Sequence, residues 1–165
     1  MTLYPDMADQ YREPFLLLNL IRSNPPLFAR SYLDKFRSRY TASDPSQPTL
    51  LNLYISLDKS RAIQTYEGLY ALEELLARLR LLAPLPPLEW SNDLHFAARD
   101  HLEDLGPLGL YGHSSSLGLS MFDRFRNYSS LEPGMLAENA CFGTTHATEA
   151  LILMLIDDGD PGARK

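Results

Sequence analysis

Three prolines within four residues, Pro84-Leu85-Pro86-Pro87, constrain the fold of this chain more than any other feature. Proline lacks an amide donor and restricts the residue before it, so no helix continues through this run. Leucines at helical spacing before the run predict a helix from Thr65, its expected cap, to about Leu82. After the run, Ser91 is placed to cap a helix over residues 92–105, which Gly106 and Pro107 are expected to end. The prolines therefore separate two helices.

The N-terminal part predicts helices over residues 10–40. Asn24 can cap the second of them, because Pro25 and Pro26 suit a first helical turn, and this helix is expected to reach about Tyr40. Residues 41–57 are expected to hold a loop and a strand. In this stretch Leu51–Leu57 alternates apolar and polar residues with a period of two, which is typical of a half-buried strand.

The second half of the chain predicts shorter elements, and residues 65–158 are expected to carry the core helices and the site loops. Ser120 is placed to cap a short helix over residues 121–127. Residues 135–142 are apolar around a polar pair and predict a strand. Thr144 or Thr145 is expected to cap a last helix that reaches about Ile156.

Composition limits the classes of function. With 165 residues, 45% of them apolar, the chain is expected to form one domain, residues 1–165. A formal charge of −6 argues against nucleic acid as a partner. The chain has one cysteine, Cys141, which we interpret as a small buried apolar residue. No apolar run approaches the length of a membrane span and no signal peptide precedes the first helix, so we expect a soluble, intracellular protein.

Four side chains are candidates for a cleft: His113, Glu138, Asp157 and Asp158. His113 follows a glycine in a loop, where an imidazole can serve as ligand, base or hydrogen-bond anchor, or simply lie in solvent. Glu138 lies among apolar residues, and a buried carboxylate must be paired or protonated; the alternative is a solvent-facing glutamate on an edge strand.

The two aspartates end a helix, where the helix dipole disfavours negative charge. A cation, an arginine or backbone amides would have to compensate for them; the alternative is a polar turn before Gly159. His101 lies on the apolar stripe of its helix, and we interpret it as a core histidine with one hydrogen bond rather than as a ligand.

Taken in order, these segments resemble the CAP superfamily (cysteine-rich secretory proteins, antigen 5 and pathogenesis-related 1), also called SCP-like domains, and most closely its cysteine-poor bacterial and protist branch. The resemblance rests on the order and spacing of the segments rather than on any one motif. The matching segments are NLIRSNPPLFA (19–29), TYEG (65–68), PLPPLEWSNDLHFAARDH (84–101), YGH (111–113), FDRF (122–125), AEN (137–139) and LIDDG (155–159).

The resemblance implies an α+β fold, an α-β-α sandwich with a central antiparallel sheet, and an open cleft in which two histidines and two acidic residues hold a divalent metal. His113 matches the first histidine of the family, Glu138 matches the glutamate of its Gly-Glu-Asn motif, and Asp157 or Asp158 lies near the second acidic position. The family's members are mostly extracellular, in contrast to the intracellular location expected from the sequence.

This sequence departs from the family pattern in three ways. Ala137 replaces the glycine before Glu138, and Leu117 stands where the branch often has aspartate. The sequence also ends before the family's His-Arg motif and closing strands, so we expect the sheet to lack its last strands and the second histidine to be missing. Tight zinc sites need three or four protein ligands, and we therefore expect at best weak zinc binding through His113 and Glu138.

Three functions remain open. We expect first a non-catalytic binding or structural interaction module, a subunit of a larger assembly that binds a protein partner through an exposed sheet edge. The second function is lipid or sterol binding at an apolar groove formed by Met121, Phe122 and Phe125, although these residues could equally pack on the sheet. The third is a metal-assisted hydrolase in which His113 and Glu138 activate water. We expect a binding role rather than an enzyme.

Overall fold

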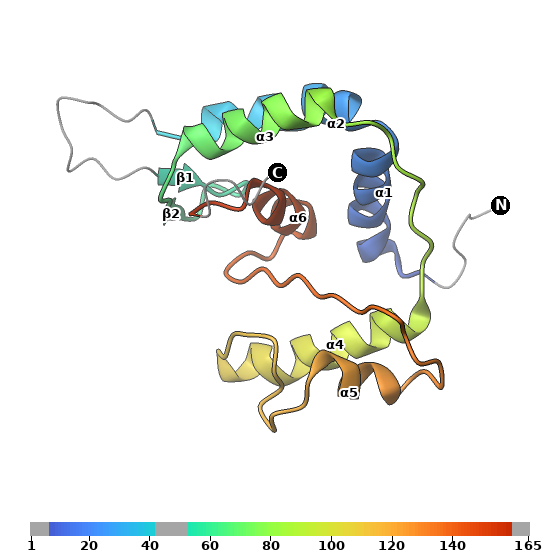
Figure 1. Ribbon diagram of the computed structural model, residues 1–165. Helices are drawn as coiled ribbons and strands as arrows, with labels where there is room; N and C mark the ends of the chain where they lie inside the picture. The colour runs from blue at the N-terminus through green and yellow to red at the C-terminus, as the bar shows by residue number, and fades with distance from the viewer. Residues whose placement is uncertain (1–6, 42–52, 160–165) are drawn as a thin grey trace. The chain divides into compact units, whose positions relative to one another are not determined.

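The structure is a computed structural model that describes residues 7–41 and 53–159 (Figure 1). Within these residues the chain forms two compact units. The terminal unit consists of Ala8–Leu88 and the segment that begins at Gly143. The middle unit consists of Met7 and Glu89–Phe142. Each unit is described by itself below.

The terminal unit begins with two α-helices and a 3-10 helix: α1 (Asp9–Ser23), α2 (Pro25–Ser31) and η1 (Leu33–Arg39). The predicted cap at Asn24 is confirmed, because its side chain accepts the N–H of Leu27 at 3.1 Å. The prediction of one helix to Tyr40 is wrong, since the chain tightens into η1. Leu33 and Phe36 are both buried. They are three residues apart, and a 3-10 helix, with three residues per turn, places both on the same face.

A two-stranded antiparallel sheet, β1 (Leu53–Ile55) and β2 (Ala62–Gln64), belongs to the same unit, and the predicted α+β class is confirmed. The register pairs Tyr54 with Ile63. The predicted strand is present, but its most buried side chain is Tyr54 rather than the flanking leucine and isoleucine. Tyr54 stacks on Phe36 and donates its hydroxyl to Glu149 at 2.6 Å, so its polar atom is satisfied within the core. Of the loop and strand predicted over residues 41–57, residues 42–52 lie outside the described residues.

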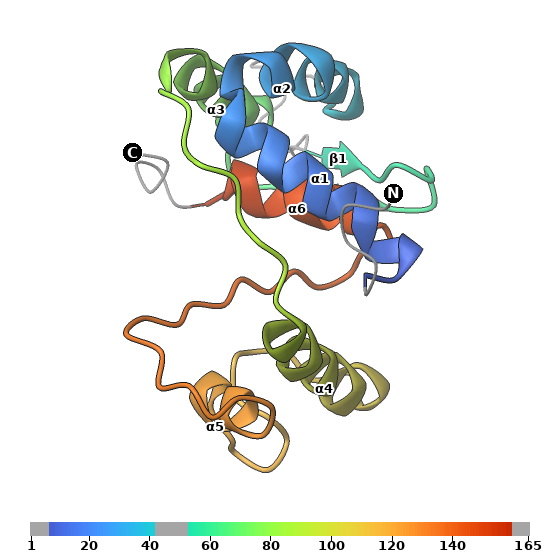
Figure 2. The same cartoon turned by 90° about the vertical axis from the view of Figure 1, so that its right-hand side faces the viewer.

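Helices α3 (Leu69–Leu81) and α6 (Ala147–Ile156) complete the core of the terminal unit (Figures 1 and 2). The predicted cap at Thr65 is wrong, because α3 begins after Gly68. The carboxylate of Asp158 accepts the N–H groups of Tyr66 and Glu67 at 2.7 and 2.8 Å. Asp158, which is remote in sequence, thus accepts hydrogen bonds from the amides just before α3. The acceptor predicted from the sequence was Thr65.

Two helices pack together in the middle unit, α4 (Asn92–Leu108) and α5 (Met121–Arg126), as both views show (Figures 1 and 2). The predicted caps are confirmed: Ser91 accepts the N–H of Leu94, and Ser120 forms a capping box with Asp123. The predicted end of α4 at residue 105 is wrong. The left-handed residue that ends this helix is Gly109, with φ of 64°, and the N–H of Leu110 bonds back to the carbonyl of Leu105 at 3.1 Å.

The predicted strand over residues 135–142 is also wrong, since this segment has no secondary structure. Burial alternates along part of the segment: Leu136, Glu138 and Ala140 are half-buried and residues 135, 137 and 139 are exposed, but Cys141 is half-buried as well. A strand needs a hydrogen-bonded neighbour as well as a pattern, and no strand pairs with this segment among the described residues. In the part of the chain that the structure describes, no helix combines the length and apolar character needed to cross a bilayer.

Candidate functional site

His113 and Glu138 meet in the middle unit. His113 lies in the loop between α4 and α5, and Glu138 lies in the extended segment after α5. The His113 Nδ1–H donates to Glu138 Oε1 at 3.0 Å, because an ionised carboxylate only accepts. The imidazole is 63% exposed and the carboxylate 18% exposed. The histidine is thus the more solvent-exposed member of the pair.

Arg124 on α5 closes the other side of this pair. Its guanidinium donates from Nη2 to Glu138 Oε2 and from Nη1 to the carbonyl oxygen of His113 at 3.0 Å. The Arg124 side chain is only 3% exposed. Sequence reasoning missed this residue, although one signal was present: Arg124 lies three positions after Met121 and next to Phe125, on the stripe that α5 buries.

These contacts keep Glu138 ionised. Burial raises the pKa of the Glu138 carboxyl, but hydrogen bonds from His113 and Arg124 and the positive charge of Arg124 outweigh burial and lower this pKa below its ordinary value. Both carboxylate oxygens are then occupied by donors of the same unit. Glu138 therefore holds the His113 loop and α5 together.

His101 lies beside this cluster. Its side chain is buried, and its Nε2 atom bonds to the carbonyl oxygen of Gly112 at 2.9 Å, which confirms the interpretation as a core histidine with one hydrogen bond. The same Nε2 atom lies 3.9 Å from Glu138 Oε1. Within the described residues, His101 Nδ1 and Arg124 Nε are buried without a hydrogen-bond partner.

The two aspartates lie in the terminal unit, whereas His113 and Glu138 lie in the middle unit. Asp157 takes a left-handed conformation, φ 49°, at the end of α6. Asp158 is compensated by backbone amides, one of the arrangements expected for a carboxylate at this end of a helix. In the same region the Glu67 carboxylate accepts a hydrogen bond from the N–H of Gly159 at 2.9 Å. Asp158 thus joins the end of α6 to the start of α3.

The residues present do not fit a tightly held zinc ion. Among the described residues, no group of three or more His, Cys, Asp or Glu side chains is arranged to hold a metal. The Glu138 carboxylate, the natural anionic ligand, already bonds to the Arg124 cation, which would repel a dication at the same oxygen. The weak zinc site thus stays a prediction.

Part of the predicted apolar groove lines a pocket of about 230 Å³ in the middle unit. Met121 and Phe125 line it together with Leu94 and Leu136, and Arg124 and Glu138 border it. Phe122 is not among its lining residues. This pocket is smaller than the roughly 300–1,000 Å³ of most small-molecule sites, and a ligand role for the groove stays a prediction.

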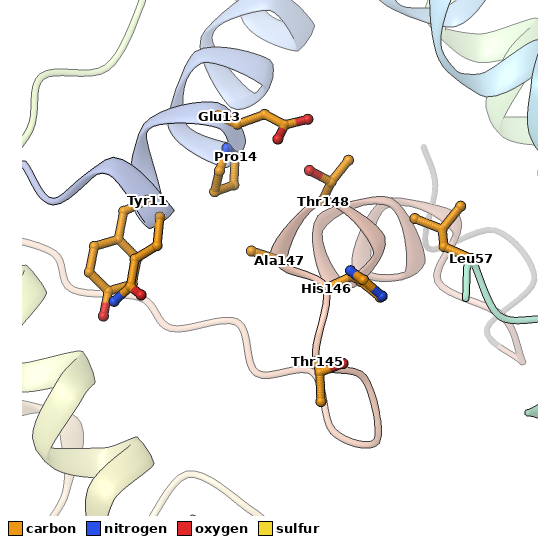
Figure 3. A pocket seen from close by; sticks show the side chains of 9 residues that line it. Tyr11, Glu13, Pro14, Leu57, Thr145, His146, Ala147 and Thr148 are labelled. Carbon is orange, nitrogen blue, oxygen red and sulfur yellow. The ribbon is translucent and has the colours of Figure 1, made fainter. Parts of the chain in front are cut away.

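Another pocket, of about 540 Å³, lies in the terminal unit (Figure 3). Tyr11, Glu13 and Pro14 of α1 face the start of α6 across it, where Thr145, His146 and Thr148 lie. It contains none of the four cleft candidates. The polar side chains around it are at most half-buried, so nothing in this pocket indicates which ligand it would take.

Comparison with known families agrees with this description. The profile described as the cysteine-rich secretory protein family, CAP, matches residues 73–160, more than half of the chain, and includes all four cleft candidates. The chain therefore belongs to the CAP family. A search of curated proteins and a search of solved structures found no match.

Proposed function

We propose that this CAP-family chain is a non-catalytic binding module whose partner is a protein. One observation carries the proposal: both oxygens of Glu138 are bonded within the middle unit, to His113 and to the buried Arg124. Although burial raises the pKa of Glu138, the hydrogen bonds from His113 and Arg124 and the positive charge of Arg124 lower it overall, which makes its carboxylate a weaker base than an ordinary glutamate. The hydrolase alternative would require a water on a remaining lone pair of Glu138 or on His113 Nε2.

Zinc provides the first test. We expect that equimolar zinc leaves the melting temperature of the full chain unchanged, because binding would have to break the contact between Arg124 and Glu138. Scanning calorimetry with and without zinc measures this. A zinc-dependent rise of several degrees that disappears in His113→Ala would contradict the proposal.

The loop between α4 and α5 is the expected recognition element. Its backbone is held by several hydrogen bonds, including Ser116 N–H to Asp104 at 2.6 Å and Ser115 N–H to the Leu119 carbonyl at 2.9 Å. The same loop exposes Tyr111 by 83% and Leu117 by 87%. A rigid loop with exposed large apolar side chains loses little entropy on binding and gains apolar burial.

Charge narrows the chemistry of the partner. The segment Glu89–Phe142 contains eight acidic and three basic residues, a formal charge of −5, out of −6 for the whole chain. Charge complementarity favours a partner with an apolar centre and a basic rim. We therefore propose that the partner presents leucine-like side chains surrounded by lysine or arginine.

A model peptide tests this proposal. A short amphipathic helical peptide of leucine and lysine is expected to bind the full chain, whereas a peptide with glutamate in place of lysine is not, and added salt is expected to weaken binding. Fluorescence anisotropy of the labelled peptide measures both. Leu117→Ser should weaken binding at least about five-fold, the scale of one apolar anchor.

Leu81→Ser is the matched control, because Leu81 is 85% exposed on α3 in the terminal unit. Its effect on peptide binding should stay within about two-fold, as for a residue outside an interface. Equal binding of the lysine and glutamate peptides, or equal effects of the two serine variants, would refute the protein-binding role of this loop.

The pocket beside Met121 favours a second candidate, binding of an apolar ligand. Its volume of about 230 Å³ suits part of an acyl chain better than a whole sterol. A fluorescent fatty acid is expected to bind at micromolar concentration more tightly than a fluorescent sterol. Phe125→Ser should weaken this binding, because Phe125 is buried and lines the pocket. Failure of both probes to bind would remove this candidate.

A further inference from the structure

Residues 81–88, at the end of α3 and just after it, are fixed along α1 in the terminal unit (Figures 1 and 2). The side chain of Asn19 exchanges two hydrogen bonds with the backbone of Leu88, at 2.7 and 3.1 Å. Arg22 adds two more: its Nε–H donates to a carbonyl oxygen of the segment at 2.9 Å, and its own carbonyl oxygen accepts an N–H of the segment at 2.8 Å. Three prolines restrict the backbone of the same stretch. The 81–88 segment is therefore an ordered part of the surface.

This segment exposes large apolar side chains next to arginines. Arg78 and Arg80 lie in the last turn of α3, and both are exposed, although Arg80 also contacts Asp34 at 3.4 Å. Residues 75–88 contain no aspartate or glutamate. The exposed leucines of the segment are Leu81, Leu82, Leu85 and Leu88. An apolar centre with basic neighbours is the chemistry inferred above for the partner of the loop between α4 and α5.

The loop between α4 and α5 has the complementary character. It exposes Tyr111 and Leu117. Asp104 accepts hydrogen bonds from the hydroxyl and the amide of Ser116 in this loop, and these bonds lower the pKa of its carboxyl, so the carboxylate stays charged beside the loop. The middle unit as a whole is acidic, whereas Ala8–Leu88 contains ten basic and eight acidic residues. The two surfaces therefore match in both apolar character and charge.

We propose that the partner of this loop is a second copy of the chain, which docks its 81–88 segment on the loop. This inference rests on the proposed function, because it names the partner of the same site. The leucines of the segment pack on Tyr111 and Leu117 of the other copy, and Arg78 and Arg80 face its carboxylates. Because every copy carries both surfaces, the contact is head-to-tail rather than between identical patches.

Sedimentation equilibrium of the full chain gives the first test. We expect the average mass to rise above 18.7 kDa with concentration, and added salt to weaken the association, because opposite charges contribute to it. Leu81→Ser and Leu117→Ser should each raise the dissociation constant at least about five-fold, the scale of one apolar anchor. Both leucines are exposed, so both variants should fold, and circular dichroism checks this.

An equimolar mixture of the two variants is the decisive measurement. The Leu81→Ser chain keeps an intact loop, and the Leu117→Ser chain keeps an intact 81–88 segment. A pair of unlike chains therefore restores one complete contact, which neither variant forms with itself. With a fluorescent label on one variant, the mixture should associate at least about five-fold more tightly than either variant alone. A mixture that associates no more tightly than the separate variants overturns the head-to-tail contact.

Leu131→Ser is the matched control, because Leu131 is exposed in the middle unit and belongs to neither surface. Its dissociation constant should stay within about two-fold of the parent chain. A mass that stays at 18.7 kDa up to about 1 mM, or equal effects of Leu131→Ser and Leu81→Ser, would overturn the second copy as partner.

The two proposals fail separately. A chain that binds the lysine peptide through Leu117 but stays monomeric keeps its protein-binding role and refutes only the second copy. The peptide assay is run at chain concentrations below those of self-association, so Leu81→Ser does not change the number of free loops and stays a valid control there.

Discussion

Glu149→Ala is expected to lower the free energy of unfolding of the terminal unit by at least about 3 kcal/mol, because buried donors left without an acceptor cost about 1–3 kcal/mol each. Glu149 is fully buried, and its carboxylate accepts the hydroxyl of Tyr54 at 2.6 Å, the N–H of Leu57 at 2.8 Å and the hydroxyl of Thr144 at 2.6 Å. Alanine removes the acceptor of all three donors, of which the Tyr54 hydroxyl is buried and the Leu57 amide and Thr144 hydroxyl are part-buried. Denaturant unfolding followed by circular dichroism measures the loss.

Two further variants show whether the loss comes from these bonds. Glu149→Gln keeps the shape and one acceptor oxygen, so it should cost clearly less than alanine. Glu103→Ala removes a glutamate whose side chain is 69% exposed and should change stability by less than about 0.5 kcal/mol. A Glu149→Ala protein within about 1 kcal/mol of the parent would show that water replaces the lost contacts.

Glu149 also makes stability depend on pH. Burial raises the pKa of its carboxyl, but the bonds from Thr144, Tyr54 and the amide of Leu57 outweigh burial and lower this pKa below the ordinary value. The folded state therefore favours the ionised form. The stabilisation is complete above the ordinary glutamate pKa of about 4.3 and is lost as the pH falls through the lower folded value. The stability difference between the parent and Glu149→Gln should narrow over that range.

Arg124→Met is expected to destabilise the middle unit by about 3 kcal/mol, because it leaves the Glu138 carboxylate half-buried without its cation. It also removes the donors to the carbonyl oxygens of His113 and Leu119. Trp90 is the only tryptophan of the sequence and lies in the middle unit, so its fluorescence follows unfolding of that unit. This signal distinguishes a local loss from a loss in the terminal unit.

Arg126→Met is the matched control, since Arg126 is exposed and pairs only with the exposed Glu132 at 3.1 Å among the contacts described. It should cost less than about 1 kcal/mol. The double variant Arg124→Met with Glu138→Met should recover much of the loss, because an apolar pair of similar volume often replaces a buried ion pair at little cost. A double variant that is less stable than Arg124→Met alone would show that Glu138 stabilises the unit through His113 rather than through Arg124.

The predictions that held depend on neighbours in sequence. Asn24, Ser91 and Ser120 cap helices as expected, because a cap is formed by a side chain and amides only two or three residues away. The resemblance to the CAP family also placed His113 and Glu138 together, and their side chains are in contact. Their role in binding or catalysis stays a prediction.

The predictions that failed depend on remote partners. The strand expected over residues 135–142 was predicted from apolar residues around a polar pair, but the segment has no strand to pair with among the described residues. The Thr65 cap was displaced by Asp158, 92 residues from Tyr66. Arg124 was overlooked because its partner Glu138 lies outside its helix, and an arginine in a short helix otherwise resembles a solvent-exposed residue.

The sequence by itself determined the caps at Asn24, Ser91 and Ser120 and most of the helical spans, because helix periodicity, proline geometry and capping act over a few residues. The order and spacing of its segments also determined the α+β class and the family to which the chain belongs. Only the tertiary structure decided which polar groups are buried and with whom they pair. Tyr54 and Glu149 are 95 residues apart, and neither residue type by itself indicates a core position. A buried polar group is stable only beside its partner, and that partner is brought close only when the chain folds.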